Sequence, residues 1–235
     1  MSDGHHVQTW QAWMSGFKQQ VAASIRQIEF EIRSAEFDIQ RWDSTKSHLN
    51  QIKGEINFLS YQLSTCQANP ESSPEEQSAM ARKRQAIMLE IASKQAEESD
   101  LQDSLDSLRR SLQEWKMVFS DDSHYRDIGL KLQESRGNRA EMAQYQGTVR
   151  QAKAIMSGAT GPGGRLSGNK YGSEIGSKIT AIEDQIEALS TMQAELLDVE
   201  KKIYTCYRTA VSMVSRIEDL LGDPDPQFDY GQKHL

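Results

Sequence analysis

The sequence is poor in the residues that interrupt helices or crosslink small folds. It has five prolines and two cysteines in 235 residues, and aromatic residues make up 7%. Proline ends or kinks a helix, and paired cysteines hold small secreted domains together, so both constraints are scarce here. With 26% charged residues and abundant Gln, Ser, Glu and Ala, the composition favours long helices and little sheet.

Long apolar runs are also missing. No uncharged apolar stretch reaches the roughly 18–20 residues that a membrane-spanning helix needs. The first fifteen residues lack the basic start and apolar run of a secretory signal. We therefore expect cytoplasmic synthesis, and we leave assembly into a virion or signal-independent export open.

Positive charge is scarce as well. The net charge is −7, which opposes general binding to nucleic acid or to an anionic membrane, because both need clustered basic residues. Membrane activity of a long-helix protein stays as an alternative function.

The sequence offers little for metal or catalytic chemistry. Cys66 and Cys206 are isolated, and no histidine has the Glu-x-x-His spacing of a di-iron bundle. Paired helices also present shallow grooves in place of the enclosed pocket that catalysis needs. We expect no enzyme activity, catalytic residue, metal, cofactor or small-molecule substrate, and we leave open whether the two cysteines pair.

What the sequence does contain is a repeating apolar pattern. Residues 21–66, 80–119 and 175–221 carry apolar side chains at alternating steps of three and four. This is the spacing of the buried seam in packed helices. It predicts an all-α fold built from long antiparallel helical hairpins, an elongated coiled-coil bundle.

Turn and cap signals mark the ends of these helices. Ser73, Pro74 and Glu76 match a capping box with proline at the first helical position, and Gly222 follows the last seam as a C-terminal cap. We expect six segments: an aromatic N-terminal segment (1–16), a long antiparallel hairpin (17–119), a weaker, locally basic helical segment (120–156), a Gly-rich flexible loop (157–172), a long C-terminal helix packing on the hairpin (173–222) and an acidic, aromatic tail (223–235).

Three features predict contact with a protein partner or with another copy of the chain. An aromatic helical face precedes the first seam, polar residues interrupt the second seam, and aromatic residues lie in the acidic tail. The candidate partner-binding residues are Trp10, Trp13, Phe17, Arg84, Lys94, Glu98, Phe228 and Tyr230. In the alternative interpretation, the aromatic face caps the bundle and the tail has no role.

Residues 126–170 form a locally basic segment, with eight basic residues against three acidic ones. Such a segment either neutralises the acidic long helices or binds an anionic partner. The candidate residues for an anionic partner are Arg136, Arg139, Arg150, Lys153 and Arg165.

These observations favour a non-enzymatic coiled-coil protein that acts through protein–protein contacts, as an assembly subunit or adaptor such as a virion or injection-machine component.

A second interpretation comes from the turn Leu166-Ser167-Gly168 and its flanks. This turn resembles the Trp-x-Gly hairpin of type VII-like secretion proteins, with Leu166 in place of the tryptophan. The resemblance implies a secreted helical hairpin or a partner of such a secretion system.

Overall fold

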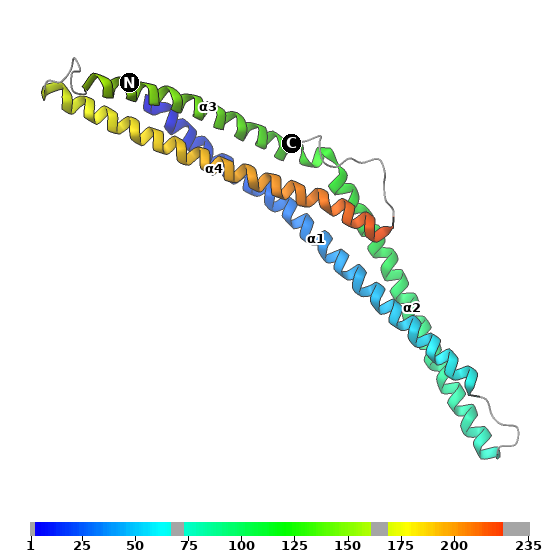
Figure 1. Ribbon diagram of the computed structural model, residues 1–235. Helices are drawn as coiled ribbons and strands as arrows, with labels where there is room; N and C mark the ends of the chain where they lie inside the picture. The colour runs from blue at the N-terminus through cyan, green and yellow to red at the C-terminus, as the bar shows by residue number, and fades with distance from the viewer. Residues whose placement is uncertain (1–2, 67–72, 161–168, 223–235) are drawn as a thin grey trace. The chain divides into compact units, whose positions relative to one another are not determined.

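The computed structural model describes residues 3–66, 73–160 and 169–222, which form four helices and no strand. The helices are α1 (Asp3–Thr65), α2 (Pro74–Ser120), α3 (Asp122–Thr160) and α4 (Asn169–Leu221) (Figure 1). The predicted all-α helical bundle is confirmed, and its elongated form stays a prediction.

The helix ends differ from the expected segments in two places. Helix α1 begins at Asp3 and passes through residues 16 and 17 without a break, so the aromatic segment is the first part of a longer helix. Helix α3 extends to Thr160 and α4 begins at Asn169, inside the expected 157–172 loop. A glycine costs a helix only about 1 kcal/mol, so backbone hydrogen bonding can carry both helices into this stretch.

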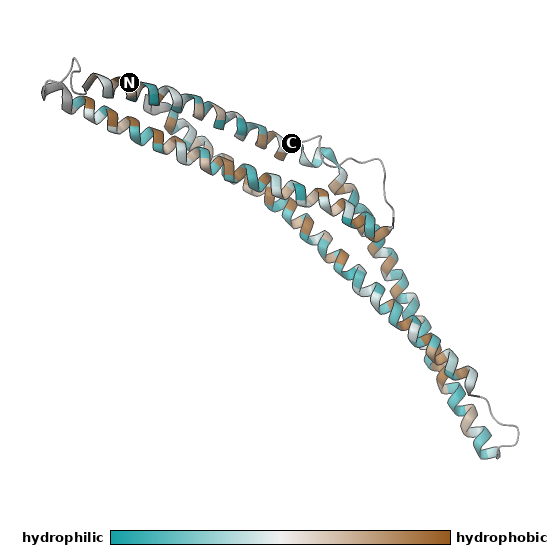
Figure 2. Cartoon of the chain, viewed as in Figure 1, coloured by the Kyte–Doolittle hydropathy of each residue, from teal (hydrophilic) through white to brown (hydrophobic). Residues whose placement is uncertain are grey.

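The helices form two compact units. Unit 1 contains α1 up to Glu31, α3, and α4 up to Ser212, and unit 2 contains α1 from Ile32, α2, and α4 from Met213. Along both units, apolar residues alternate with polar ones on every helix, as Figure 2 shows. Each helix therefore has one apolar stripe to bury against its neighbours.

Unit 1 is a three-helix bundle. Helix α3 is antiparallel to α1, because Trp13 meets Glu134 whereas the later Ser24 meets the earlier Asp127. It is also antiparallel to α4, because Arg139 meets Glu200 whereas the later Lys153 meets the earlier Glu183. The buried apolar side chains come from all three helices: Val7, Met14, Phe17, Val21, Ile28, Tyr125, Ile128, Leu132, Met142, Val149, Leu189, Met192, Leu196, Ile203, Cys206 and Ala210. These residues follow the heptad spacing of the sequence.

Unit 2 is built on an antiparallel hairpin of α1 and α2. The Asp38 carboxylate accepts hydrogen bonds from Ser111 Oγ at 2.6 Å and Trp115 Nε1 at 3.0 Å. Farther along, Cys66 Sγ lies 3.1 Å from Met80 Sδ. Since the α1 numbers rise while the α2 numbers fall, the two helices run in opposite directions, as the sequence predicts.

Both predicted caps are confirmed. The backbone N–H of Ser73 donates to the Glu76 carboxylate at 3.0 Å, and the N–H of Glu76 donates to Ser73 Oγ at 3.3 Å. Gly222 has a φ of 70° and donates its N–H to the carbonyl of Glu218 at 2.9 Å. Glycine has no Cβ to clash in this left-handed conformation, so it ends α4 without strain.

We expect the buried seam residues to supply most of the folding stability. Substitution of two adjacent leucines of α4 tests this expectation. Leu196 is fully buried in unit 1, whereas 41% of Leu197 is exposed. We expect Leu196→Ala to lower the free energy of unfolding by about 2–5 kcal/mol, because it leaves a cavity in the core. Leu197→Ala, the matched control, should cost less than about 1 kcal/mol. Urea denaturation followed by circular dichroism measures both, and equal losses would contradict the seam assignment.

Candidate functional site

The N-terminal aromatic face packs inside unit 1. Trp13 Nε1 donates to the Glu134 carboxylate at 2.8 Å, and the Trp13 ring stacks on buried Phe17 with 4.7 Å between ring centroids. Trp10 meets the ring of Tyr145 edge-on at 5.6 Å. Helix α3 therefore covers much of this face, and a partner contact through Trp10, Trp13 and Phe17 stays a prediction.

The polar seam residues of α2 have partners in unit 2. Arg84 Nη1 donates to the carbonyl of Cys66 at 3.0 Å, at the C-terminal end of α1. Lys94 Nζ lies 2.8 Å from a Glu55 oxygen and 3.2 Å from Glu97. The Lys94 hydrogen bond is the main cause that lowers the pKa of Glu55, and the Glu55 hydrogen bond raises the pKa of Lys94.

Glu98 completes this polar layer, with an oxygen 3.9 Å from Lys53 Nζ. The ion pairs of the layer are half-exposed, so they add little stability but do favour one register of α1 on α2. Binding of a partner by Arg84, Lys94 and Glu98 stays a prediction. No local pattern indicates which α1 residues pair with them, because several seam registers satisfy the apolar spacing.

The basic residues of α3 fall into two groups. Arg139 and Lys153 form ion pairs with α4, to Glu200 at 3.0 Å and to Glu183 at 2.6 Å. Arg136 and Arg150 are exposed. Part of the basic segment therefore neutralises an acidic helix of unit 1, as one of the two interpretations expected, and part of it is open to solvent.

A buried carboxylate of α4 forms a charge contact with α3 in unit 1. Glu200 is only 7% exposed, and Arg139 holds both of its carboxylate oxygens, with Nε at 3.0 Å and Nη2 at 3.1 Å. Buried Ser135 donates a third hydrogen bond to it at 3.1 Å. A buried carboxylate needs such partners, and two N–H groups of one guanidinium also fix its direction. A glutamate at a seam position was the sequence signal for this cluster.

A second polar layer lies about two to three helical turns away. The side-chain amide of Gln146, a buried residue of α3, donates to the carbonyl of Ile186 at 2.9 Å and to Ser190 Oγ at 2.6 Å. This layer and the Glu200 contact both link α3 to α4, so they restrict how α3 can slide along its neighbour.

A cluster of titratable residues lies where α3 begins. His124 Nε2 is 2.7 Å from the Glu31 carboxylate, and the rings of Tyr125 and Tyr207 meet edge-on at 5.1 Å. Burial raises the pKa of Tyr125, and burial first, then the charges of Glu29 and Glu31, raises the pKa of the Cys206 thiol to about 11. Cys66 and Cys206 are both free thiols. Sequence reasoning missed the His124–Glu31 contact, since 93 residues separate the two.

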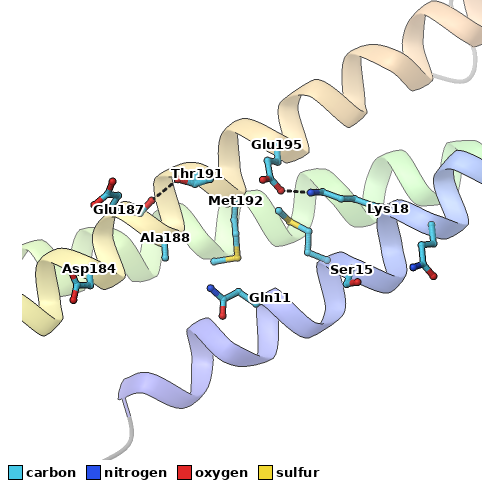
Figure 3. Close-up of a pocket in the computed structure, with 11 residues that line it drawn as sticks. Gln11, Ser15, Lys18, Asp184, Glu187, Ala188, Thr191, Met192 and Glu195 are labelled. Atoms are coloured by element: carbon cyan, nitrogen blue, oxygen red, sulfur yellow. Dashed lines mark hydrogen bonds and ion pairs between the residues drawn. The ribbon is translucent and has the colours of Figure 1, made fainter.

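An open groove lies between α1 and α4 in unit 1. One part has a volume of about 680 Å³ and a second about 620 Å³, and Lys18, Thr191 and Glu195 line both, so we treat them as one α1–α4 groove. Met192 extends from α4 toward α1, and Lys18 reaches from α1 to Glu195 (Figure 3). Its apolar lining is Met14, Val21, Ala22, Ile25, Ala188, Met192, Ala194 and Val199.

The rim of the α1–α4 groove is mainly acidic. It carries Asp184, Glu187, Glu195 and Asp198 against Lys18 and Lys202. Lys18 pairs with Glu195 and Lys202 with Asp198, so Asp184 and Glu187 are left without an ion pair within the described part of the chain. Sequence reasoning did not find this groove, because it requires knowing that α1 and α4 lie side by side.

Three candidate residues, Arg165, Phe228 and Tyr230, lie outside the described residues. Within the described ranges, no three His, Cys, Asp or Glu side chains are placed to hold a metal ion. Among the same residues, no helix is long and apolar enough to cross a membrane.

Comparison with protein-family models, curated proteins and solved structures finds no match for this chain.

The Glu200 contact can be tested by unpairing it. We expect Glu200→Ala to lower the free energy of unfolding by about 1.5–3 kcal/mol, because it leaves Arg139 and Ser135 without their shared acceptor. Asp198→Ala, which breaks an exposed pair with Lys202, should cost about 0–1 kcal/mol. Urea denaturation of both variants gives the comparison. An equal loss in the two would mean that the buried contact has no special role.

The Cys206 thiol should resist alkylation in the folded protein. With a pKa of about 11, only about one thiol in a thousand is ionised at pH 8. The unfolded chain has its ordinary pKa near 8.5, so we expect iodoacetamide to modify native Cys206 at least about a hundredfold more slowly than in urea. Mass spectrometry of the Cys206 peptide measures both rates.

The sign of the pH effect on stability follows from the same pKa. The folded state holds the thiol proton more tightly, so the stabilising contribution of Cys206 is complete below the unfolded pKa and declines as the pH rises toward 11. The alkylation rate of the native protein should rise with pH over that window. A rate that is independent of pH there would contradict the assignment.

Proposed function

We propose that this protein is a non-enzymatic coiled-coil protein that acts through protein–protein contacts, as an assembly subunit or adaptor such as a virion or injection-machine component. One observation carries the proposal: the outer end of the α1–α2 hairpin exposes large apolar side chains. Phe58, Tyr61, Met88 and Leu89 are 60%, 67%, 57% and 66% exposed.

These four side chains lie at one level of unit 2. The Glu55–Lys94 ion pair and the Cys66–Met80 contact join α1 to α2 on either side of them. We call the four residues the hairpin-end cluster. They lie off the seam, because the neighbouring Leu59 and Ile87 are the buried residues there.

The hairpin-end cluster supports a contact role for a physical reason. Only two helices pack at this level of unit 2, so outward positions face water and would ordinarily be polar. Single exposed apolar residues are common on protein surfaces, whereas four large ones within about two turns of one hairpin end favour contact with a partner. Aromatic residues such as Phe58 and Tyr61 are also enriched at protein interfaces.

Photo-crosslinking in native cells tests the proposal. A photoreactive phenylalanine analogue at Phe58 or at Leu89 should give a covalent adduct with a defined protein, identified by mass spectrometry. The same analogue at Phe37, which is also 60% exposed in unit 2 but outside the hairpin end, is the matched control and should give no such adduct.

Two results would overturn the proposal. One is the absence of any adduct from either hairpin-end position in cells that make the protein at its native level. The other is equal labelling of many unrelated proteins from Phe58, Leu89 and Phe37, which indicates random collision and not a specific contact.

A further inference from the structure

The α1–α4 groove lies on a flank of unit 1 that α3 leaves open. Residues of α1 and α4 line both of its parts, whereas α3 meets α1 through Trp10, Trp13 and Ser24, which do not line it. The floor is apolar and open to solvent, since Ala22 and Ala194 are exposed. A three-helix bundle with such a groove between two of its helices has room for a fourth helix.

The two helices that border the groove run in the same direction. Lys18 pairs with Glu195, and farther along both helices the Ile25 carbonyl oxygen lies 4.0 Å from Cys206 Sγ. A helix carries partial positive charge at its N-terminal end and negative charge at its C-terminal end, so antiparallel neighbours attract and parallel neighbours repel. Helix α3 runs antiparallel to both, and a helix in the groove is favoured in that same direction.

The unpaired charge of the groove is concentrated toward one end. At residues 195–202 of α4, both rim carboxylates have a lysine partner. About two to three turns earlier along α4, Asp184 and Glu187 have no ion pair within the described ranges. A helix antiparallel to α4 places its C-terminal turns beside these two carboxylates. Lysine or arginine in those turns is also favoured by the dipole of the entering helix.

We propose that the α1–α4 groove binds an amphipathic helix of a partner protein, antiparallel to α1 and α4, with one apolar stripe and with lysine or arginine in its last turns. The proposal rests on the protein–protein function proposed above and adds a second contact surface and the chemistry of its partner. Charge complementarity selects this occupant through Asp184 and Glu187. Gln11 and Ile25, at the ends of the α1 lining, are fourteen residues apart, roughly 21 Å, which about four helical turns fill.

A second copy of this chain does not offer the helix that the groove requires. None of the four described helices has a basic residue in its last turn. A copy of any of them, laid antiparallel in the groove, would bring no positive charge from its final turn to Asp184 and Glu187. The partner is therefore a different protein.

Selection from a displayed peptide library tests the proposal. The probe is a set of helical peptides of about 18 residues, with a fixed stripe of leucine and alanine and with Lys, Glu or Gln varied in the first and last turns. Peptides selected on the purified full-length protein should be enriched in lysine in the last turn. A selected peptide should bind at least about tenfold more tightly than its counterpart with glutamate in that turn, as measured by fluorescence anisotropy.

Charge variants of the protein locate the contact. Asp184→Lys/Glu187→Lys should raise the dissociation constant of the lysine-ended peptide at least about tenfold, and it should bind the glutamate-ended peptide instead, because the charge pattern is inverted. Asp100→Lys/Asp103→Lys makes the same change in charge on exposed residues of α2 and should leave both dissociation constants unchanged.

A second pair of variants tests the apolar floor. Ala22→Trp places an indole ring in the groove and should weaken binding of the selected peptide at least about tenfold. Ala23→Trp, at the next exposed residue of α1, does not alter the lining and should have no effect. Circular dichroism melting shows whether each variant folds. If Ala22→Trp does not fold, Ala194→Trp replaces it, because Ala194 is an exposed residue of the α4 side of the lining.

Four results would overturn the proposal. The first three are selection of no binding peptide, selected peptides without a preference for positive charge in the last turn, and equal binding to folded Ala22→Trp and Ala23→Trp proteins. The fourth is self-association, seen by sedimentation velocity, that Ala22→Trp abolishes and Ala23→Trp retains, since a second copy would then be the occupant. None of these affects the crosslinking test of the hairpin-end cluster, so the groove contact can fail while the proposed function stands.

Discussion

The buried contact of Glu200 with Arg139 and Ser135 fixes the arrangement on which unit 1 depends. Apolar seams alone leave the register of two long helices poorly defined, because a slide by one heptad buries a similar set of side chains. A buried carboxylate removes that freedom, since at a wrong register it would lie against apolar groups without a donor. The Gln146 layer applies the same constraint a little farther along. The two contacts together therefore determine which residues of α3 and α4 face each other.

In unit 2, weaker polar contacts of the same kind align α1 with α2. Asp38 binds Ser111 and Trp115 across the hairpin, and Lys94 holds Glu55 and Glu97 near its outer end. The Lys94 pairs are half-exposed, so water screens them and their main effect is on alignment. Because only two helices pack at that level, the seam alone supplies the core, and the outward side chains of the hairpin end remain exposed to solvent.

The local structure of this chain could be predicted from its sequence with good accuracy. The three seams, the Ser73–Glu76 capping box and the Gly222 cap all depend on residues close together in sequence, where spacing and stereochemistry suffice. Helix ends in the Gly-rich stretch could not be placed, because a glycine only weakens a helix and does not stop it.

The candidate sites could not be located without the tertiary structure. The seams indicate that helices pair but not which pairs form, so neither the cover of Trp13 by α3 nor the α1–α4 groove could be deduced. Glu200 was visible as a polar interruption of its seam, and Arg139 as part of a basic segment, yet nothing in sequence connects residues 61 apart. Long-range pairs of this kind depend on register, which local patterns do not determine.

The basic residues of α3 show how a segment that is basic in sequence becomes partly neutral in the fold. Arg139 and Lys153 are bound to carboxylates of α4, and Lys131 pairs with Asp127 on its own helix. Each of these ion pairs offsets a positive charge that the sequence count assigns to the segment. The charge that α3 presents to solvent is therefore smaller than its count of basic residues indicates, because the fold places acidic side chains beside them.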